Sequence, residues 1–143
     1  TLLDGCIDDD GIVIPGKSTL VITKPQGKEN ELLFPLALIN SKISLFYIKE
    51  KYRGSSYNQG INFNPDMLNN LPVPFIGKTT MQLIVTIVKK IIKESQKEHD
   101  TNEFEQDLNN TFYKLYELTF DEVKVLDPEF SLTKKEYEAI KLE

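Results

Sequence analysis

The side chains best suited to chemistry lie between residues 42 and 59. Four of them are cations, Lys42, Lys49, Lys51 and Arg53, and only one acid, Glu50, lies among them. Hydroxyl and amide side chains follow in a polar stretch bounded by two glycines: Ser55, Ser56, Tyr57, Asn58 and Gln59. Lysine and arginine contact phosphates, and Arg, Asn and Gln can read base edges. The pattern is typical of a loop that meets nucleic acid, although a solvated helix end would carry the same lysines.

Other chemistries have weaker support in the sequence. His99 is the only histidine and Cys6 the only cysteine, so these residues build neither a structural zinc site nor an internal disulfide. No glycine-rich phosphate loop occurs. Asp66 after a proline, with Glu122 and Lys124 much later, superficially matches the core of a metal-dependent nuclease. That core needs carboxylates on adjacent strands, whereas Glu122 and Lys124 fall in an expected helix, so we disfavour it.

The charge of the chain is divided unequally along its length. The 143 residues have a formal net charge of −5 and ordinary globular composition, which favours one compact unit. Residues 1–93 hold 11 basic and 8 acidic side chains, whereas 94–143 hold 6 and 14. The acidic total therefore does not argue against a nucleic-acid partner for the first part. We expect a cytoplasmic protein without a membrane partner, because neither a secretory signal nor a membrane-length apolar run occurs.

The elements that must position these residues are of two kinds. Short β-branched runs at 11–15 and 18–24, bounded by turn residues, predict a hairpin, and 61–63 predicts a further short strand. Apolar residues at helical spacing predict one helix over 31–52. Asn64 is expected to cap a single helical turn, with proline at its first position.

The remainder of the chain predicts helices over 79–98, 101–117, 120–127 and 134–142. The last three each follow a capping-box pattern, formed by Asp100 with Glu103, Thr119 with Glu122 and Thr133 with Glu136. The predicted fold class is α+β, with short antiparallel strands packed on a long helix and followed by a helical C-terminal part. We expect an α+β recognition module over 1–76 and a helical part over 77–143 that packs on it.

Three segments in order carry a resemblance to a known family. These are 36–47, with an Asn-Ser-Lys centre and aromatics after it, the Gly-Ser-Ser-Tyr loop at 54–57, and 62–74, which ends in Leu-Pro-Val-Pro. Together they resemble the TaqI-like C-terminal specificity domain, found in adenine-specific DNA methyltransferases and single-chain restriction–modification enzymes. The resemblance covers roughly residues 8–126.

The resemblance implies a sequence-specific DNA recognition domain of a bacterial type II restriction–modification enzyme, with double-stranded DNA as its partner. The Asn-Pro-Pro-Tyr motif and the S-adenosylmethionine glycine motif of the family are missing here, so the chain itself is not expected to be an enzyme. S-adenosylmethionine and Mg²⁺ would belong to methyltransferase and nuclease domains of a longer parent chain, as the start at Thr1 also suggests. The residues expected to meet DNA are Lys42, Lys49, Lys51, Arg53, Ser55, Ser56, Tyr57, Asn58 and Gln59.

A second interpretation comes from the acidic helices at the end of the chain. Residues 100–143 could form a protein-interaction module that docks on a basic neighbouring domain of the same protein. The two interpretations concern different parts of the chain and can both hold.

Overall fold

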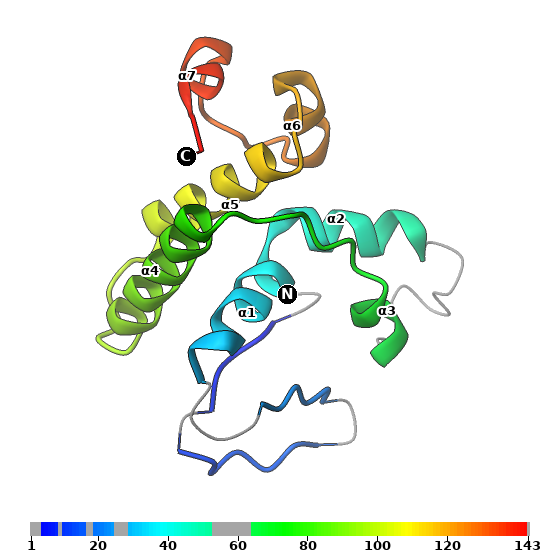
Figure 1. Ribbon diagram of the computed structural model, residues 1–143, viewed down its shortest axis with the longest axis vertical. Coiled ribbons are helices and arrows are strands. Elements are labelled where there is room, and N and C mark those ends of the chain that lie inside the picture. Colours follow the sequence, from blue (N-terminus) through cyan, green and yellow to red (C-terminus); the bar gives the residue numbers. More distant parts are fainter. Residues whose placement is uncertain (1–3, 9, 17–18, 25–28, 53–63, 143) are drawn as a thin grey trace.

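Every regular element in the described part of the chain is a helix (Figure 1). The computed structural model describes residues 4–8, 10–16, 19–24, 29–52 and 64–142. In chain order the elements are the 3₁₀ helix η1 (Glu29–Leu32) and the α-helices α1 (Leu33–Asn40), α2 (Lys42–Lys51), α3 (Pro65–Asn69), α4 (Lys78–Ser95), α5 (Asn102–Leu115), α6 (Phe120–Leu126) and α7 (Lys134–Ala139). Among these helices, none is long and apolar enough to cross a bilayer.

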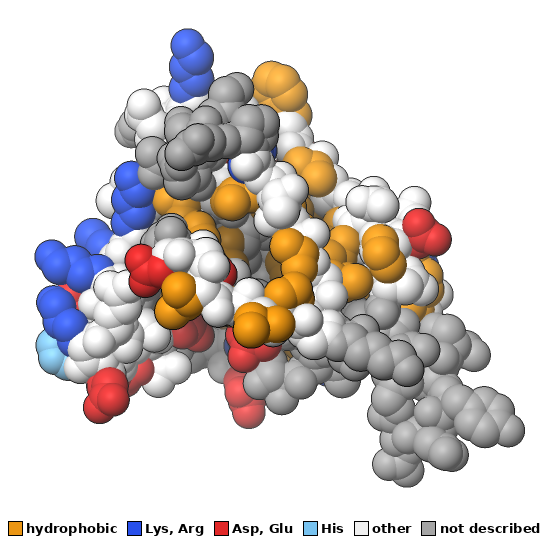
Figure 2. All heavy atoms as spheres, turned by 90° about the horizontal axis from the view of Figure 1, so that it is seen from below, with side chains coloured by type: hydrophobic (Ala, Val, Ile, Leu, Met, Phe, Trp, Pro, Cys, Tyr) orange, Lys and Arg blue, Asp and Glu red, His pale blue; other side chains and the backbone are white. Residues whose placement is uncertain are grey.

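The α+β prediction is wrong, because the residues expected to form the hairpin make no strand where they are described. Ile12 and Ile14 expose 76% and 92% of their surface, and no helix covers them. Figure 2 views the molecule from below relative to Figure 1 and shows apolar side chains facing solvent. A two-stranded hairpin without a packing partner is only marginally stable. The strand expected at 61–63 lies outside the described residues.

The single helix predicted over 31–52 is two helices, because buried Ser41 interrupts it. Its backbone is extended, with φ −71° and ψ 148°. The Ser41 hydroxyl donates to the carbonyl of Leu38, at 2.7 Å, and accepts from the backbone N–H of Ser44. One side chain thus satisfies backbone groups at the end of α1 and the start of α2. The two helices therefore run at an angle to one another (Figure 1).

The main hydrophobic core lies between α1, α4 and α5. Its buried members are Leu33, Ala37 and Leu38 of α1, Ile84, Ile87 and Val88 of α4, and Leu108 and Phe112 of α5. The amphipathic pattern of α4 follows the predicted helix over 79–98 closely. Residues before 76 and after 77 both contribute to this core, so the two predicted parts, 1–76 and 77–143, share it.

Two smaller hydrophobic clusters lie outside the main core. Ile48, with no exposed surface, packs with Met67 and Leu71 and joins α2 to α3. Aromatic rings join α5, α6 and α7, where Phe130 meets Tyr113 and Tyr137 edge-on with centroids 5.9 and 5.6 Å apart. Edge-to-face packing suits the charge distribution of the rings.

Local capping signals were the most accurate part of the sequence prediction. Asn64 caps α3, and the capping boxes of α6 and α7 form as expected at Thr119 and Thr133. The box expected at Asp100 is wrong. The helix α5 has Thr101 at its N-cap position, and Asp100 instead accepts a bond from the Asn102 N–H at 2.9 Å.

The capping boxes give a pH-dependent prediction. Bonds from Thr119 and Thr133 hold the pKa of Glu122 and of Glu136 below the ordinary value of 4.5. A lowered folded-state pKa means that this stabilisation is complete above pH 4.5 and is lost as the pH falls through the lowered pKa. The Thr133 hydroxyl is the largest cause at Glu136, whereas the backbone N–H is the largest cause at Glu122.

We therefore expect Thr119→Ala to raise the pKa of Glu122 and Thr133→Ala to raise that of Glu136, because each variant removes the hydroxyl that donates to the carboxylate. Side-chain carboxyl resonances followed by NMR across pH 2–6 measure both, and each variant serves as the control for the other box. No shift at the glutamate of the altered box would contradict the capping geometry.

Candidate nucleic-acid interface

The last turn of α2 presents two of the predicted cations. Lys49 is exposed and has no hydrogen-bond or ion-pair partner in the described part of the chain. The ammonium of Lys51 donates to the Tyr47 hydroxyl at 2.6 Å and lies 5.0 Å from the centre of the Tyr47 ring. It also lies 5.7 Å from the ring centre of Tyr52. The Tyr47 hydrogen bond raises the pKa of Lys51, so the side chain remains a cation.

The same tyrosine fixes the end of α2 against its neighbour. The Tyr47 hydroxyl donates to the backbone carbonyl of Asn70 at 3.0 Å, just after α3. Beneath it, Ile48 is buried against Met67 and Leu71. A side chain on a packed helix loses little further freedom when it binds a ligand, so this helix end is a suitable platform for contacts.

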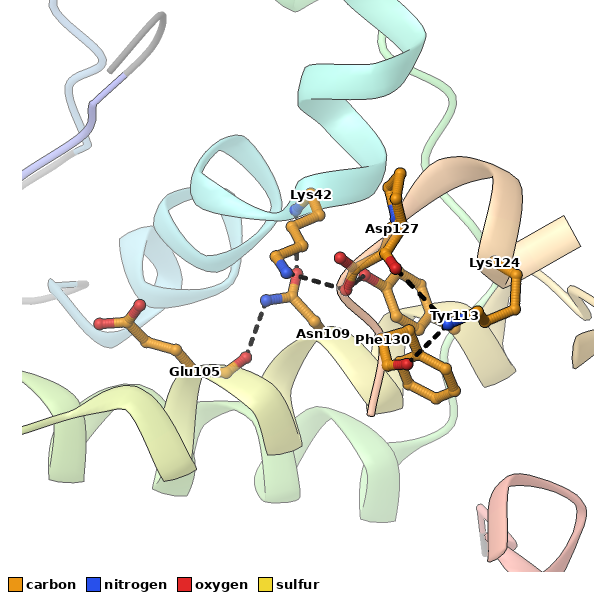
Figure 3. Close-up of polar contacts among 8 residues, drawn as sticks. Lys42, Glu105, Asn109, Tyr113, Lys124, Asp127 and Phe130 are labelled. Atoms are coloured by element: carbon orange, nitrogen blue, oxygen red, sulfur yellow. Dashed lines mark hydrogen bonds and ion pairs between the residues drawn. The ribbon is translucent and has the colours of Figure 1, made fainter. Parts of the chain in front are cut away.

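Lys42, at the opposite end of α2, enters a polar network with α5 and the residues after α6 (Figure 3). Its ammonium pairs with an Asp127 carboxylate oxygen at 2.8 Å. Its backbone N–H donates to the Asn109 side-chain oxygen at 2.9 Å, and the Asn109 amide donates to the carbonyl of Glu105 at 2.8 Å. Nine residues at 1.5 Å each place Lys42 about 14 Å along the helix from Lys51.

The carboxylate of Asp127 is nearly enclosed, with 9% of its side chain exposed. The hydroxyl of Tyr113 donates to the oxygen that pairs with Lys42, at 3.2 Å. Burial first, and then the charge of Asp127, raise the pKa of Tyr113, so it remains a neutral donor. In the segment after α6 that contains Asp127, the carbonyl of Phe130 accepts a hydrogen bond from the Lys124 ammonium at 2.9 Å (Figure 3).

The structure separates the predicted site residues into three groups. Lys49 and Lys51 lie together at one end of α2, and Lys42 lies at the other end with its charge already matched by Asp127. The remaining members lie outside the described residues, namely Arg53, Ser55, Ser56, Tyr57, Asn58 and Gln59. The sequence did not indicate Asn109 or Asp127, which are 67 and 85 residues from Lys42 and belong to no local pattern.

The residues of the disfavoured nuclease pattern have other roles. Asp66 lies in the first turn of α3. The Glu122 carboxylate accepts from the backbone N–H and the hydroxyl of Thr119, both at 2.7 Å, and Lys124 donates to backbone carbonyls. Among the residues that the structure describes, no three His, Cys, Asp or Glu side chains gather in a group that could hold a metal ion.

Comparisons with protein-family models, with curated proteins and with solved structures gave no match.

The contact between Lys42 and Asp127 gives a stability prediction. Asp127→Ala leaves the buried Tyr113 hydroxyl without its acceptor, so we expect it to lower the free energy of unfolding by about 1–3 kcal/mol. Lys42→Met leaves the nearly enclosed Asp127 carboxylate with the Tyr113 hydroxyl but without its cation, so we expect a similar loss, about 1–3 kcal/mol. Urea unfolding of both single variants and the double variant measures the coupling between the two residues.

The exposed pair of Lys134 and Glu138, 3.9 Å apart on α7, is the matched control and should show almost no coupling. If the loss of unfolding free energy in the double variant equalled the sum of the two single losses, Lys42 and Asp127 would not be coupled. The network would then not anchor α2.

Proposed function

We propose that the chain is the DNA-recognition part of a bacterial restriction–modification enzyme, in line with its resemblance to TaqI-like specificity domains. The supporting observation is the end of α2. Lys49 and Lys51 stand there on a helix anchored through Tyr47 and Ile48, with no carboxylate matched to either ammonium in the described residues. The chain then enters 53–63, where the predicted base-reading residues occur.

In the proposed mechanism, cations position the duplex and polar side chains read it. Lys49 and Lys51 contact phosphates, which fixes register but carries no sequence information. Arg53 and the polar residues 55–59 contact base edges in the major groove. Lys42 contributes chiefly by fixing the start of α2, because a phosphate would have to displace Asp127 from its ammonium.

The chemistry of the parent enzyme belongs to other domains of the same protein in this proposal. A methyltransferase domain would bind S-adenosylmethionine and methylate adenine after flipping it from the duplex. A nuclease domain, where the parent also cleaves, would use Mg²⁺. This chain would hold the duplex in register for both and is itself not catalytic.

Lys49→Ala combined with Lys51→Ala tests the proposal. Removing two phosphate contacts should weaken binding similarly for all duplex sequences and lower the slope of log K against log salt by up to about 1.8. Fluorescence anisotropy with labelled duplexes of several sequences, from 50 to 300 mM salt, measures both quantities.

The matched control is Lys135→Ala with Lys141→Ala, which removes the same charge from exposed positions in the acidic C-terminal part. An unchanged slope in the α2 variant, or an equal loss in the control, would reject the α2 site.

The alternative, docking of 100–143 on a basic domain, cannot be separated by deleting that segment. Leu108 and Phe112 belong to the main core, so the deletion would unfold the chain that it is meant to test. The salt series tests DNA binding by the α2 lysines without a deletion, and docking through the acidic helices alone predicts no effect of these lysines on DNA affinity.

A further inference from the structure

The solvent side of α4 carries four lysines, and the single acid of this helix, Glu94, lies at the border of that side. At 100° per residue, the exposed positions Lys78, Gln82, Lys89 and Lys93 fall within about 60°, and Lys90 lies about 60° beyond Lys93. Figure 2 shows Lys side chains gathered at one edge of the molecule, beside the histidine. In the described residues, none of these four ammonium groups pairs with a carboxylate.

The nearest acid along the helix is already neutralised. Glu94 accepts from the Lys97 ammonium at 3.0 Å and lies 2.7 Å from a ring nitrogen of His99. The bond with His99 is the largest cause that holds the pKa of Glu94 below its ordinary value. Glu94 therefore does not offset the cations that precede it on α4.

Helix stability does not account for this arrangement of charge. Lys78 lies in the first turn, where the helix dipole disfavours a cation, and that turn holds no acid. Lys89 and Lys93 are one helical step of four residues apart, a spacing at which like charges repel. Only Lys93 occupies the last turn, where a cation is favoured.

The uncharged side chains between the lysines indicate the class of partner. Thr79 and Gln82 are exposed and offer a hydroxyl and an amide donor, which commonly contact phosphate oxygens, whereas the Thr86 hydroxyl already donates to the Gln82 carbonyl at 2.8 Å. Leu83 is the one large apolar side chain counted as exposed on α4. A protein partner would need a cluster of aromatic or apolar anchors surrounded by polar residues, and on this face Leu83 stands without another such side chain among the described residues of α4.

We propose that this face of α4 is a second contact surface for the phosphate backbone of double-stranded DNA. Fifteen residues separate Lys78 from Lys93, about 22 Å of helix, which exceeds the major-groove width of about 12 Å. The face can therefore reach phosphates on both sides of a groove. The inference rests on the proposed function in that the chain binds DNA, but it uses a different element and different residues.

The test uses two double variants of the 143-residue chain. The α4 variant combines Lys89→Ala with Lys93→Ala, and the control combines Lys135→Ala with Lys141→Ala. The probe is a labelled 30-base-pair duplex of mixed sequence, titrated from 50 to 300 mM salt, with unlabelled poly-L-glutamate as competitor. Both lysines are exposed, so circular dichroism should show unchanged folding.

We expect the α4 variant to bind at least five-fold more weakly at low salt, with a slope smaller by up to about 1.8, while the control stays within two-fold of the unmodified chain. An unchanged slope, or an equal loss in the control, would overturn the inference. Poly-L-glutamate that competes as well as duplex at equal charge would overturn the assignment to DNA.

The two proposals fail in distinguishable ways. Loss of binding in the α2 variant alone would reject the α4 surface and leave the proposed recognition site standing. Loss in the α4 variant alone would reject the α2 site and support the second surface.

Discussion

The position of α2 depends on the contact between Lys42 and Asp127. A carboxylate as enclosed as that of Asp127 is costly unless a cation and hydrogen-bond donors satisfy it. Lys42 and Tyr113 supply these, and together they hold the residues after α6 against the first turn of α2. This contact fixes the start of α2 together with the bond from the Lys42 N–H to Asn109. At the far end Tyr47 completes the restraint through its bond to the Asn70 carbonyl.

Charge is distributed in the fold according to whether it is matched within the chain. Lys42, Lys97 and Lys134 each pair with an acid, and Lys124 donates to backbone carbonyls. The contacts of Lys42 and Lys124 contribute to the folded structure, whereas the exposed pairs of Lys97 and Lys134 contribute little. The lysines at the end of α2 and on the face of α4 have no such acid among the described residues, which leaves their charge available to a partner. The net acidity of the whole chain conceals this difference.

The features predicted correctly from the sequence are those set by neighbouring residues. The capping boxes at Thr119 and Thr133, and the cap at Asn64, involve partners three residues away, so the sequence carries the whole interaction. Helices α4 and α5 were predictable from their apolar spacing. The interruption at Ser41 was missed, because the periodic pattern continues across it and the competing side-chain bonds of serine leave no mark on that pattern.

The failures concern interactions between distant residues. Ile14 has strand-like neighbours, but a strand needs a partner surface, and the structure leaves this side chain exposed. Likewise nothing in the sequence around Lys42 indicates its pairing with a carboxylate 85 residues later. The position of Lys49 and Lys51 at a helix end needed no such information, because the local pattern already predicts the end of the helix there.

Amide chemical-shift mapping tests the central claim, that α2 ends in a DNA contact, most directly. The measurement is a ¹H–¹⁵N NMR titration of the 143-residue chain with a mixed-sequence duplex at low salt. We predict the largest shifts from Lys49 through Gln59, with α6 and α7 unaffected. Shifts confined to α6 and α7, or no shifts at the end of α2, would contradict the account.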